Sequence, residues 1–296
     1  MQTEAVTYLI QRAESQVGLC YLLTLYAFIR ATTAAEGTLW YVLSVVFCVL
    51  GMAAKEVMAT APVMVFFYDR TFVAGTFAGA WRRRWWLYVA LAATWLLLAW
   101  LMLGSGSRGE AGAFDSGTRW YQYAATEFGV VLHYLRMIFW PGPMILDYGG
   151  AVLEKSAFRI ALSGLTILLL LAGTVVGLRR RPVLGFLGCW FFGILAPTSS
   201  VVPLVDTIFE HRIYLSLAAV LVLLVAGIYR WLGRGGFRML AALAEAFGFL
   251  ATIRNRDYRS EFAIWTDTVA KRPDNARAYN NLGSLWLGQD KLPEAE

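Results

Sequence analysis

"IALSGLTILLLLAGTVVGL" (160–178) runs through the chain without a single charged residue. A helix needs about 20 predominantly apolar residues to cross a bilayer, and similar runs lie at 87–103 and 216–229. Of the 296 residues, 58% are hydrophobic and 16% are charged, whereas a soluble domain has about 25% charged residues. The alternating short strands of a membrane β-barrel do not occur in these runs. The sequence therefore predicts an all-α protein, a polytopic membrane helical bundle.

Three basic clusters orient the predicted spans. They lie at 82–84, at 179–181 and at Arg230, Arg234 and Arg238. Short loops rich in Lys and Arg stay on the cytoplasmic side, and about eight crossings place all three clusters there. The expected spans, to within several residues, are 17–34, 38–54, 57–73, 85–103, 158–178, 183–200, 213–230 and 239–253.

The segment "WYQYAATEFGVVLHYLRMIFW" (120–140) is apolar but carries Glu127, His133 and Arg136. Counted as a further crossing, it would move the later basic clusters to the outer side. We therefore expect an interfacial or re-entrant helix on the non-cytoplasmic side. The prolines of "WPGPMILDY" (140–148) would end that helix.

Polar stretches fall on that same predicted side. They are "QTEAVTYLIQRAE" (2–14), "AAKE" (53–56), "ILDY" (145–148) and "DTIFEHR" (206–212), and the sequence from about 254 onward falls there too. Any one charged group at a helix end can be a plain interfacial anchor. Convergence of several such groups is what would indicate a functional site.

Two of these stretches offer charges of opposite sign. In a helix over 3–15, Glu4 and Arg12 share one face, which either is solvated or lines a cavity. Lys55 and Glu56 interrupt an apolar region, where a lysine at the centre of a span would cost roughly 2.5–3.5 kcal/mol. The pair is therefore expected at a tight hairpin at the membrane surface. The alternative is an active-site pair, because ionisable residues within a membrane mark functional sites.

The stretch "DTIFEHR" lies between two strongly apolar runs. Asp206 and Glu210 are one helical turn apart, and His211 and Arg212 follow directly. An arginine at a lipid interface suits a phosphate group, because its planar fork carries a permanent charge. The alternative is a local ion network that caps a span. The residues by themselves favour neither hypothesis.

Several common chemistries lack their motifs in this sequence. No GxSxG, Walker loop, HExxH or CxxC occurs, which argues against the usual hydrolases, ATPases and zinc proteases. Cys20, Cys48 and Cys189 lie in apolar spans without metal-ligand spacing, so we expect small core residues and no metal site. The net charge of +6 comes from basic residues beside spans, so we expect no nucleic-acid partner.

The C-terminal stretch "PDNARAYNNLGSLWLGQDKLPEAE" (273–296) has the spacing of a tetratricopeptide repeat, a helix–turn–helix unit of about 34 residues. The preceding "EFAIWTDTVAKRPDN" (261–275) reads as the second helix of an earlier half-repeat. About three repeats are needed for a stable array. The residues expected to pack the repeat are Tyr279, Leu282, Gly283, Trp286 and Ala295.

Five stretches, in this order, resemble the transmembrane and tetratricopeptide-repeat O-mannosyltransferases and their bacterial relatives. Each motif is modest, but the five in order are quite specific, and the resemblance runs nearly end to end. The stretches are "QTEAVTYLIQRAES" (2–15), "GMAAKEVMATAPVMVFFYD" (51–69), "YLRMIFWPGPMILDY" (134–148), "PTSSVVPLVDTIFEHRIYL" (197–215) and "RNRDYRSEFAIWTDTVAKRPDNARAYNNLG" (254–283).

That family resembles the GT-C glycosyltransferases. The resemblance implies a polyprenyl- or dolichyl-phosphate sugar as donor, and protein hydroxyl groups or other glycans as acceptor at the lumenal or periplasmic face. It implies supporting catalytic roles for Glu4, Arg12, Lys55 and Glu56. It places His211 and Arg212 at the lipid phosphate.

Four further site residues are assigned with these. We expect Arg136 to contribute to lipid-phosphate binding. We expect Asp206, Glu210 and Asp147 to orient the site.

The sequence departs from the family in one respect. Members usually carry an acidic pair, often Asp-Asp, in a first lumenal loop, which acts as general base and as metal or acceptor contact. That loop precedes the region in hand. We therefore expect a sequence truncated at both ends, without its catalytic base and inactive alone. The expected domains are a GT-C-like transmembrane domain (1–253) and the start of a periplasmic tetratricopeptide-repeat domain (254–296).

The hypothesis is thus a fragment of a membrane glycosyltransferase, in the bacterial inner membrane, that moves a mannose-like sugar from a polyprenyl phosphate to protein. Its partners would be membrane lipid, the lipid-linked donor and a protein bound through the repeats. A divalent metal is left open as a cofactor. One alternative is a non-catalytic membrane-anchored repeat scaffold. A second is a transporter, which would place broken helices and charges at the bilayer midplane.

Overall fold

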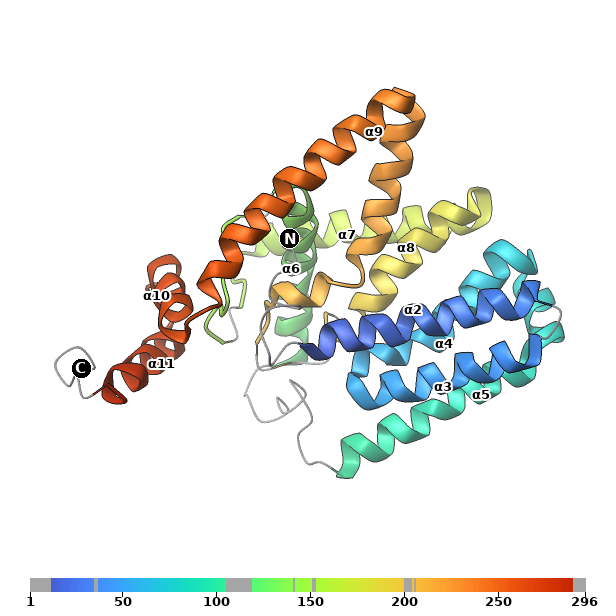
Figure 1. Cartoon of the computed structure of the whole chain (residues 1–296), viewed down its shortest axis with the longest axis horizontal. Coiled ribbons are helices and arrows are strands. Elements are labelled where there is room, and N and C mark those ends of the chain that lie inside the picture. The colour runs from blue at the N-terminus through green and yellow to red at the C-terminus, as the bar shows by residue number, and fades with distance from the viewer. Residues whose placement is uncertain are drawn as a thin grey trace.

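A computed structural model gives the structure of the chain, and every regular element in its described part is helical, which confirms the all-α prediction (Figure 1). The described residues are 12–34, 37–104, 119–140, 142–150, 153–199, 204 and 206–289.

The described helical elements follow one another along the chain. Among the described residues, α3, α5, α7 and α9 are long and apolar enough to cross a membrane. In chain order the elements are α2 (Arg12–Thr33), α3 (Gly37–Ala54), η2 (Glu56–Thr60), α4 (Ala61–Tyr68), η3 (Asp69–Val73), α5 (Phe77–Gly104), α6 (Trp120–Phe139), α7 (Ala157–Arg180), α8 (Pro182–Leu195), η5 (Glu210–Ile213), α9 (Leu217–Asp257), α10 (Glu261–Lys271) and α11 (Ala276–Leu287).

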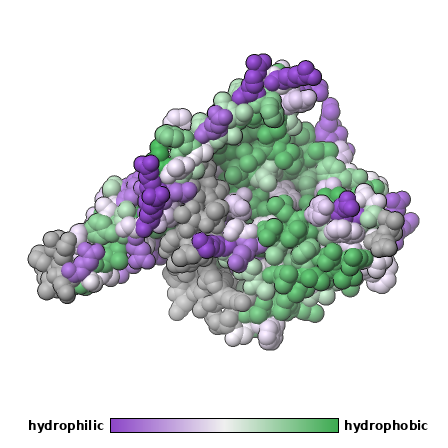
Figure 2. Space-filling view, in the orientation of Figure 1, coloured by the Kyte–Doolittle hydropathy of each residue, from purple (hydrophilic) through white to green (hydrophobic). Residues whose placement is uncertain are grey.

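The long helices expose apolar side chains that a soluble protein would bury. On α7, Leu168 and Leu169 are 60% and 63% exposed, and Val222 on α9 is also exposed. A helix that is hydrophobic on all sides is typical of a membrane span or of a fully buried helix. In Figure 2 hydrophobic residues cover a broad area over the bundle, and hydrophilic residues gather toward its margins. The apolar exterior therefore indicates contact with lipid.

Three expected spans differ in detail from the helices that occupy them. The expected span 57–73 consists of η2, α4 and η3, three short helical segments in succession. The last two expected spans fall within α9, which folds back on itself at Gly233 (φ 53°, ψ −133°) (Figure 1). Only glycine adopts a positive φ at little cost, so Gly233 allows the sharp reversal.

The helix α6 occupies the segment 120–140. In Figure 1 it runs across the direction of α2 and α3. Its buried residues recur every three or four positions and include Tyr123, Glu127, Val130 and Tyr134. That spacing places them on one stripe of the helix, which packs against the bundle.

A buried polar network ties the helix ends that lie far from α6. Both carboxylate oxygens of Asp69 accept hydrogen bonds from Arg84 Nη1, at 2.9 and 2.8 Å, and Asp69 also accepts from the hydroxyl of Tyr88. Arg84 Nε donates to the hydroxyl of Tyr41 at 2.9 Å. Arg84 departs from helical geometry (φ −139°, ψ 27°), so α5 bends where it joins α3 and η3.

The last two helices form a small pair after α9 (Figure 1). The side chains of Ser260 and Asn275 cap α10 and α11 by accepting backbone N–H groups, which satisfies donors left open in the first turn. The rings of Phe262 and Trp286 meet edge to face with centroids 4.4 Å apart. This aromatic contact packs the two helices together.

Four of the five expected repeat residues lie on α11. Tyr279 is half exposed, Leu282 and Gly283 are partly buried, and Trp286 makes the contact with Phe262. Ala295 lies outside the described residues.

Candidate functional site

The candidate site lies at the end of the bundle where α2 begins and α3 passes into η2. The loops 142–150 and 206–212 meet it there, beside the foot of α6 (Figure 1). Hydrogen bonds and ion pairs connect these segments. The convergence of polar stretches is therefore a feature of the folded chain.

Glu14 is the centre of a buried charge cluster. Its Oε1 lies 2.5 Å from Lys55 Nζ and 3.7 Å from His211 Nε2. Glu14 is 4% exposed and His211 is completely buried. A buried charge is costly unless it is paired, so the glutamate and the lysine stabilise each other in this position.

Glycine brings α2 close enough for this contact. A Cβ added at Gly18 would lie 3.0 Å from Tyr214 Cε1, so α2 packs directly against the end of η5. Glu14 is one turn before Gly18 on the same face. The close approach therefore sets Glu14 beside His211.

Sequence reasoning missed Glu14, although a signal was present. Glu14, Val17, Gly18 and Tyr21 are all buried, which is the spacing of one helical stripe. A glutamate in line with that apolar stripe faces the interior. The helix face expected to carry Glu4 and Arg12 differs from the buried face of α2 that carries Glu14.

The other candidates near this cluster are placed as follows. Arg12 opens α2 and is exposed, and its carbonyl accepts from Ser15 Oγ at 2.8 Å. Glu4 lies outside the described residues. Glu56 is in the first turn of η2 and partly buried. Lys55 directly precedes η2 in an extended conformation, so it lies at a tight turn between two helices.

Arg212 is folded back onto its own loop. Its Nη1 donates to the carbonyl of Thr207 at 3.0 Å and its Nη2 to that of Asp206 at 2.8 Å. The guanidinium also lies over the ring of Phe209, 5.3 Å from the centroid. These contacts hold the Arg212 guanidinium in a fixed orientation in a buried position.

Glu210 joins the two loops of the site. Its Oε1 accepts from the backbone N–H of Ile145 at 2.7 Å and from the hydroxyl of Tyr148 at 3.1 Å. The Tyr148 hydroxyl in turn lies 3.3 Å from His133 Nε2 on α6. Glu210 therefore holds the loop 142–150 against η5.

Asp147 and Asp206 meet the C-terminal helix pair. Arg277 on α11 lies 3.1 Å from Asp147 Oδ2 and 3.0 Å from Asp206 Oδ1. Asn275 Nδ2 donates to the carbonyl of Asp147 at 2.9 Å, and Lys271 Nζ donates to that of Met144 at 2.9 Å. These contacts attach α10 and α11 to both loops of the site.

An apolar groove of about 630 Å³ runs between α4, α6, α7 and α8. Glu127 and Ser199 line it near the site, and Leu178 lines it near the basic turn between α7 and α8. The remaining lining is Val63, Met64, Phe67, Ala124, Phe128, Val131, Ile167, Leu171, Thr174, Val175, Cys189, Phe192, Gly193, Leu195 and Ala196. The groove thus offers a long apolar surface that leads to a polar end.

The groove reaches the charged loops through Tyr123. The Tyr123 hydroxyl donates to the carbonyl of Thr198 at 2.9 Å, next to Ser199. Burial raises the pKa of Tyr123, the charge of Glu127 raises it further, and the charge of Arg212 lowers it. Tyr123 is one turn before Glu127 on the buried stripe of α6, so its hydrogen bond joins that stripe to the segment after α8.

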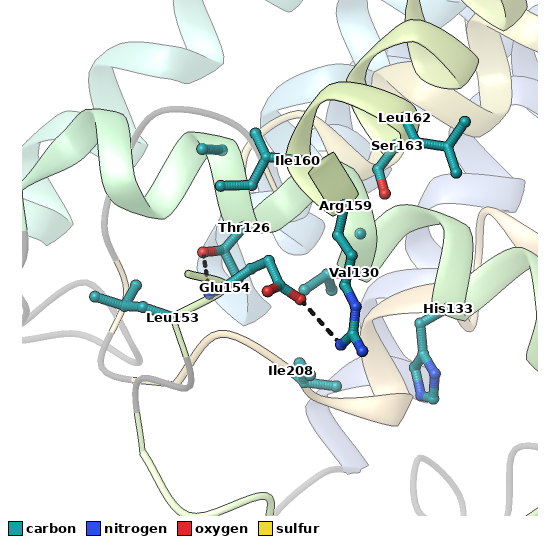
Figure 3. A pocket seen from close by; sticks show the side chains of 12 residues that line it. Thr126, Val130, His133, Leu153, Glu154, Arg159, Ile160, Leu162, Ser163 and Ile208 are labelled. Atoms are coloured by element: carbon teal, nitrogen blue, oxygen red, sulfur yellow. Dashed lines mark hydrogen bonds and ion pairs between the residues drawn. The ribbon is translucent and has the colours of Figure 1, made fainter. Parts of the chain in front are cut away.

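A second pocket, of about 390 Å³, lies between α6 and the start of α7 (Figure 3). Arg159 and Glu154 face each other in it at 3.6 Å, and His133 lies at its other side. Burial lowers the pKa of His133, and the charge of Arg136 lowers it further. Arg136 itself is exposed.

Within the described part of the chain, no three His, Cys, Asp or Glu side chains are grouped so that they could hold a metal ion. Comparison with protein families, curated proteins and solved structures finds no match.

Proposed function

We propose that this chain belongs to a membrane glycosyltransferase that binds a polyprenyl-phosphate sugar and transfers the sugar to protein hydroxyl groups. One observation carries the proposal: the basic side chains of Lys55, His211 and Arg212 gather at one end of the bundle, and the segment between α8 and η5 connects that end to a long apolar groove. A ligand suited to both has an anionic head and an extended apolar tail. The resemblance to the O-mannosyltransferases names a ligand of that chemistry.

The groove would hold the polyprenyl tail. Ile167 and Leu178 line it on α7 and are separated by about 16 Å along the helix. Its wall is almost entirely apolar, so burial of a hydrocarbon chain would be favourable by roughly 25 cal/mol per Å². Gly193 lets Met64 of α4 pack closely against α8 in this wall, since a Cβ at 193 would lie 2.6 Å from Met64 Cε.

The cationic groups would stabilise the leaving phosphate. In the transfer step an acceptor hydroxyl oxygen forms a bond to the anomeric carbon. The bond from that carbon to the phosphate oxygen breaks, and its electron pair leaves with the phosphate. Arg212, Lys55 and His211 are held by neighbouring groups before the reaction, as electrostatic stabilisation of developing charge requires. The resemblance assigns the acceptor's proton to an acidic residue of the family's first lumenal loop.

The membrane topology that accompanies this function has eight spans, with α6 as an interfacial helix. The basic turns would face the cytoplasm, and the site would face the periplasm of a bacterial inner membrane. The direction of α6 across α2 and α3 supports this assignment. Sulfhydryl labelling of single cysteines at 83, 180 and 277 from each side of the membrane tests it.

The helix pair α10 and α11 would open an array of tetratricopeptide repeats that presents the acceptor protein. Its position against the loops 142–150 and 206–212 supports this role. An acceptor held there would reach the site directly.

Photo-crosslinking tests the proposal. The protein, in lipid nanodiscs, is irradiated with a polyprenyl phosphate that carries a diazirine in its tail. We expect labelled peptides from α7 and α8, and loss of labelling when unlabelled polyprenyl-phosphate mannose competes. Labelling that an excess of phosphatidylglycerol removes equally well would overturn donor binding and favour the membrane-anchored scaffold.

A further inference from the structure

Glu127 is an unusual member of the groove wall. Among the described residues that line the groove, it is the only one with a charged side chain. It is 2% exposed and lies on the buried stripe of α6. An ionisable residue in such a place marks a functional site by default.

The position of Glu127 along the groove is informative. Tyr123 lies one turn before it on the same stripe, and Ser199 lines the same end of the groove. The Tyr123 hydroxyl donates to the carbonyl of Thr198, beside Ser199, at 2.9 Å. Glu127 is therefore at the end of the groove next to the segment between α8 and η5, which carries Asp206 and Thr207, the hydrogen-bond partners of Arg212.

The chemistry of a carboxylate narrows what it could bind there. An ionised glutamate only accepts hydrogen bonds, and it repels a phosphate. A ligand group that suits it carries several hydroxyl donors and lies next to the phosphate. In a polyprenyl-phosphate sugar that group is the sugar.

We propose that Glu127 accepts hydrogen bonds from the hydroxyl groups of the donor sugar and so distinguishes the sugar-loaded lipid from bare polyprenyl phosphate. The inference rests on the proposed function and adds to it a residue that recognises the sugar. The repulsion between Glu127 and a phosphate would also favour release of the bare lipid after transfer. Hydrogen bonding to the sugar and repulsion of the phosphate would both favour binding of the sugar-loaded lipid over the bare polyprenyl phosphate.

The test compares two lipids with the same tail. Affinities of polyprenyl phosphate and polyprenyl-phosphate mannose are measured by native mass spectrometry in nanodiscs for wild type and Glu127→Gln. We expect Glu127→Gln to lower the affinity for polyprenyl-phosphate mannose by about 10- to 100-fold. This is the range for loss of a hydrogen bond to a charged group. Bare polyprenyl phosphate should bind the variant as well as wild type or more tightly. Glu154→Gln, in the second pocket, is the matched control and should change neither affinity.

Four results would overturn the inference. Equal loss of affinity for both lipids would show that Glu127 only supports the structure of the head site. Unchanged affinity for both lipids would show that Glu127 does not take part in lipid binding. Failure of wild type to bind either lipid would overturn the proposed function itself, and the inference with it. If Glu127→Gln does not fold, wild type is tested with deoxymannose lipids. Equal affinity for every deoxy analogue and for the mannose lipid would then exclude hydroxyl recognition.

Discussion

Glu14 and Lys55 form a buried ion pair with Nζ and Oε1 2.5 Å apart, although they are separated by 41 positions in the chain. The pair joins the first turn of α2 to the turn between α3 and η2. His211 adds a third group from η5. One carboxylate therefore connects three segments of the site.

Replacement of Lys55 can distinguish its contribution to stability from its contribution to lipid binding. Lys55→Met leaves Glu14 buried without its lysine, and breaking a buried pair typically costs about 3–5 kcal/mol. We expect a lower Tm in detergent and about tenfold weaker binding of polyprenyl phosphate, from the loss of one positive charge at the head site. The double variant Glu14→Gln, Lys55→Met should recover much of the Tm without recovering affinity. Recovery of both would show that Lys55 acts only through folding; the exposed Lys155→Met is the control.

The groove can be blocked from one side of α7. Val175 and Val176 are both 51% exposed, but only Val175 is among the residues that line the groove. We expect Val175→Trp to fill the groove and to weaken polyprenyl-phosphate binding at least tenfold, because the tail loses apolar contact. Val176→Trp should bind as wild type does. The same affinity for both variants would place the lipid elsewhere.

Arg277 should control attachment of the helix pair. Arg277→Ala removes its contacts to Asp147 and Asp206, and since the side chain is 40% exposed each pair contributes at most about 1 kcal/mol. We expect severalfold faster proteolysis between α9 and α10, and a similar acceleration of wild type at high salt, which screens exposed charges. Arg256→Ala, on the exposed side of α9, provides the comparison. Equal proteolysis rates for Arg277→Ala and Arg256→Ala would mean that Lys271 and Asn275 are enough to hold the helix pair against the loops.

The network around Asp69 should contribute to stability at a distance from the site. Arg84→Met leaves Asp69 buried without its bidentate partner, so we expect a large fall in Tm. The exposed Arg83→Met should shift Tm little. Because the network lies away from the charged loops, Arg84→Met protein that remains folded should bind polyprenyl phosphate normally. A loss of binding at unchanged Tm would contradict this separation.

Much of the fold follows from local sequence. The apolar runs predict helices because each backbone polar group in a membrane must be bonded within its own segment. The helices found over 157–180 and 217–257 follow from runs of that kind. The reversal at Gly233 is also a local effect, since it depends on a residue that tolerates positive φ.

Only part of the candidate site could be predicted from the sequence. Lys55, His211, Arg212 and Glu210 were candidates because charged residues between apolar runs are unusual. Glu14 was not, since its role depends on the stripe of α2 that packs inward. Asp147 and Asp206 were expected to orient the site, but their partner Arg277 lies in a helix remote in sequence.

The sequence by itself determined that the protein is all-helical and which runs are long and apolar enough to cross a membrane. Those properties depend on runs of neighbouring residues and on the cost of exposing their backbone in lipid. Only the tertiary structure decided that Glu14 pairs with Lys55 and that Glu127 faces a groove between four helices. The physical reason is that the partner of a buried charge is set by which helix faces pack together, and one chain segment does not specify its neighbours.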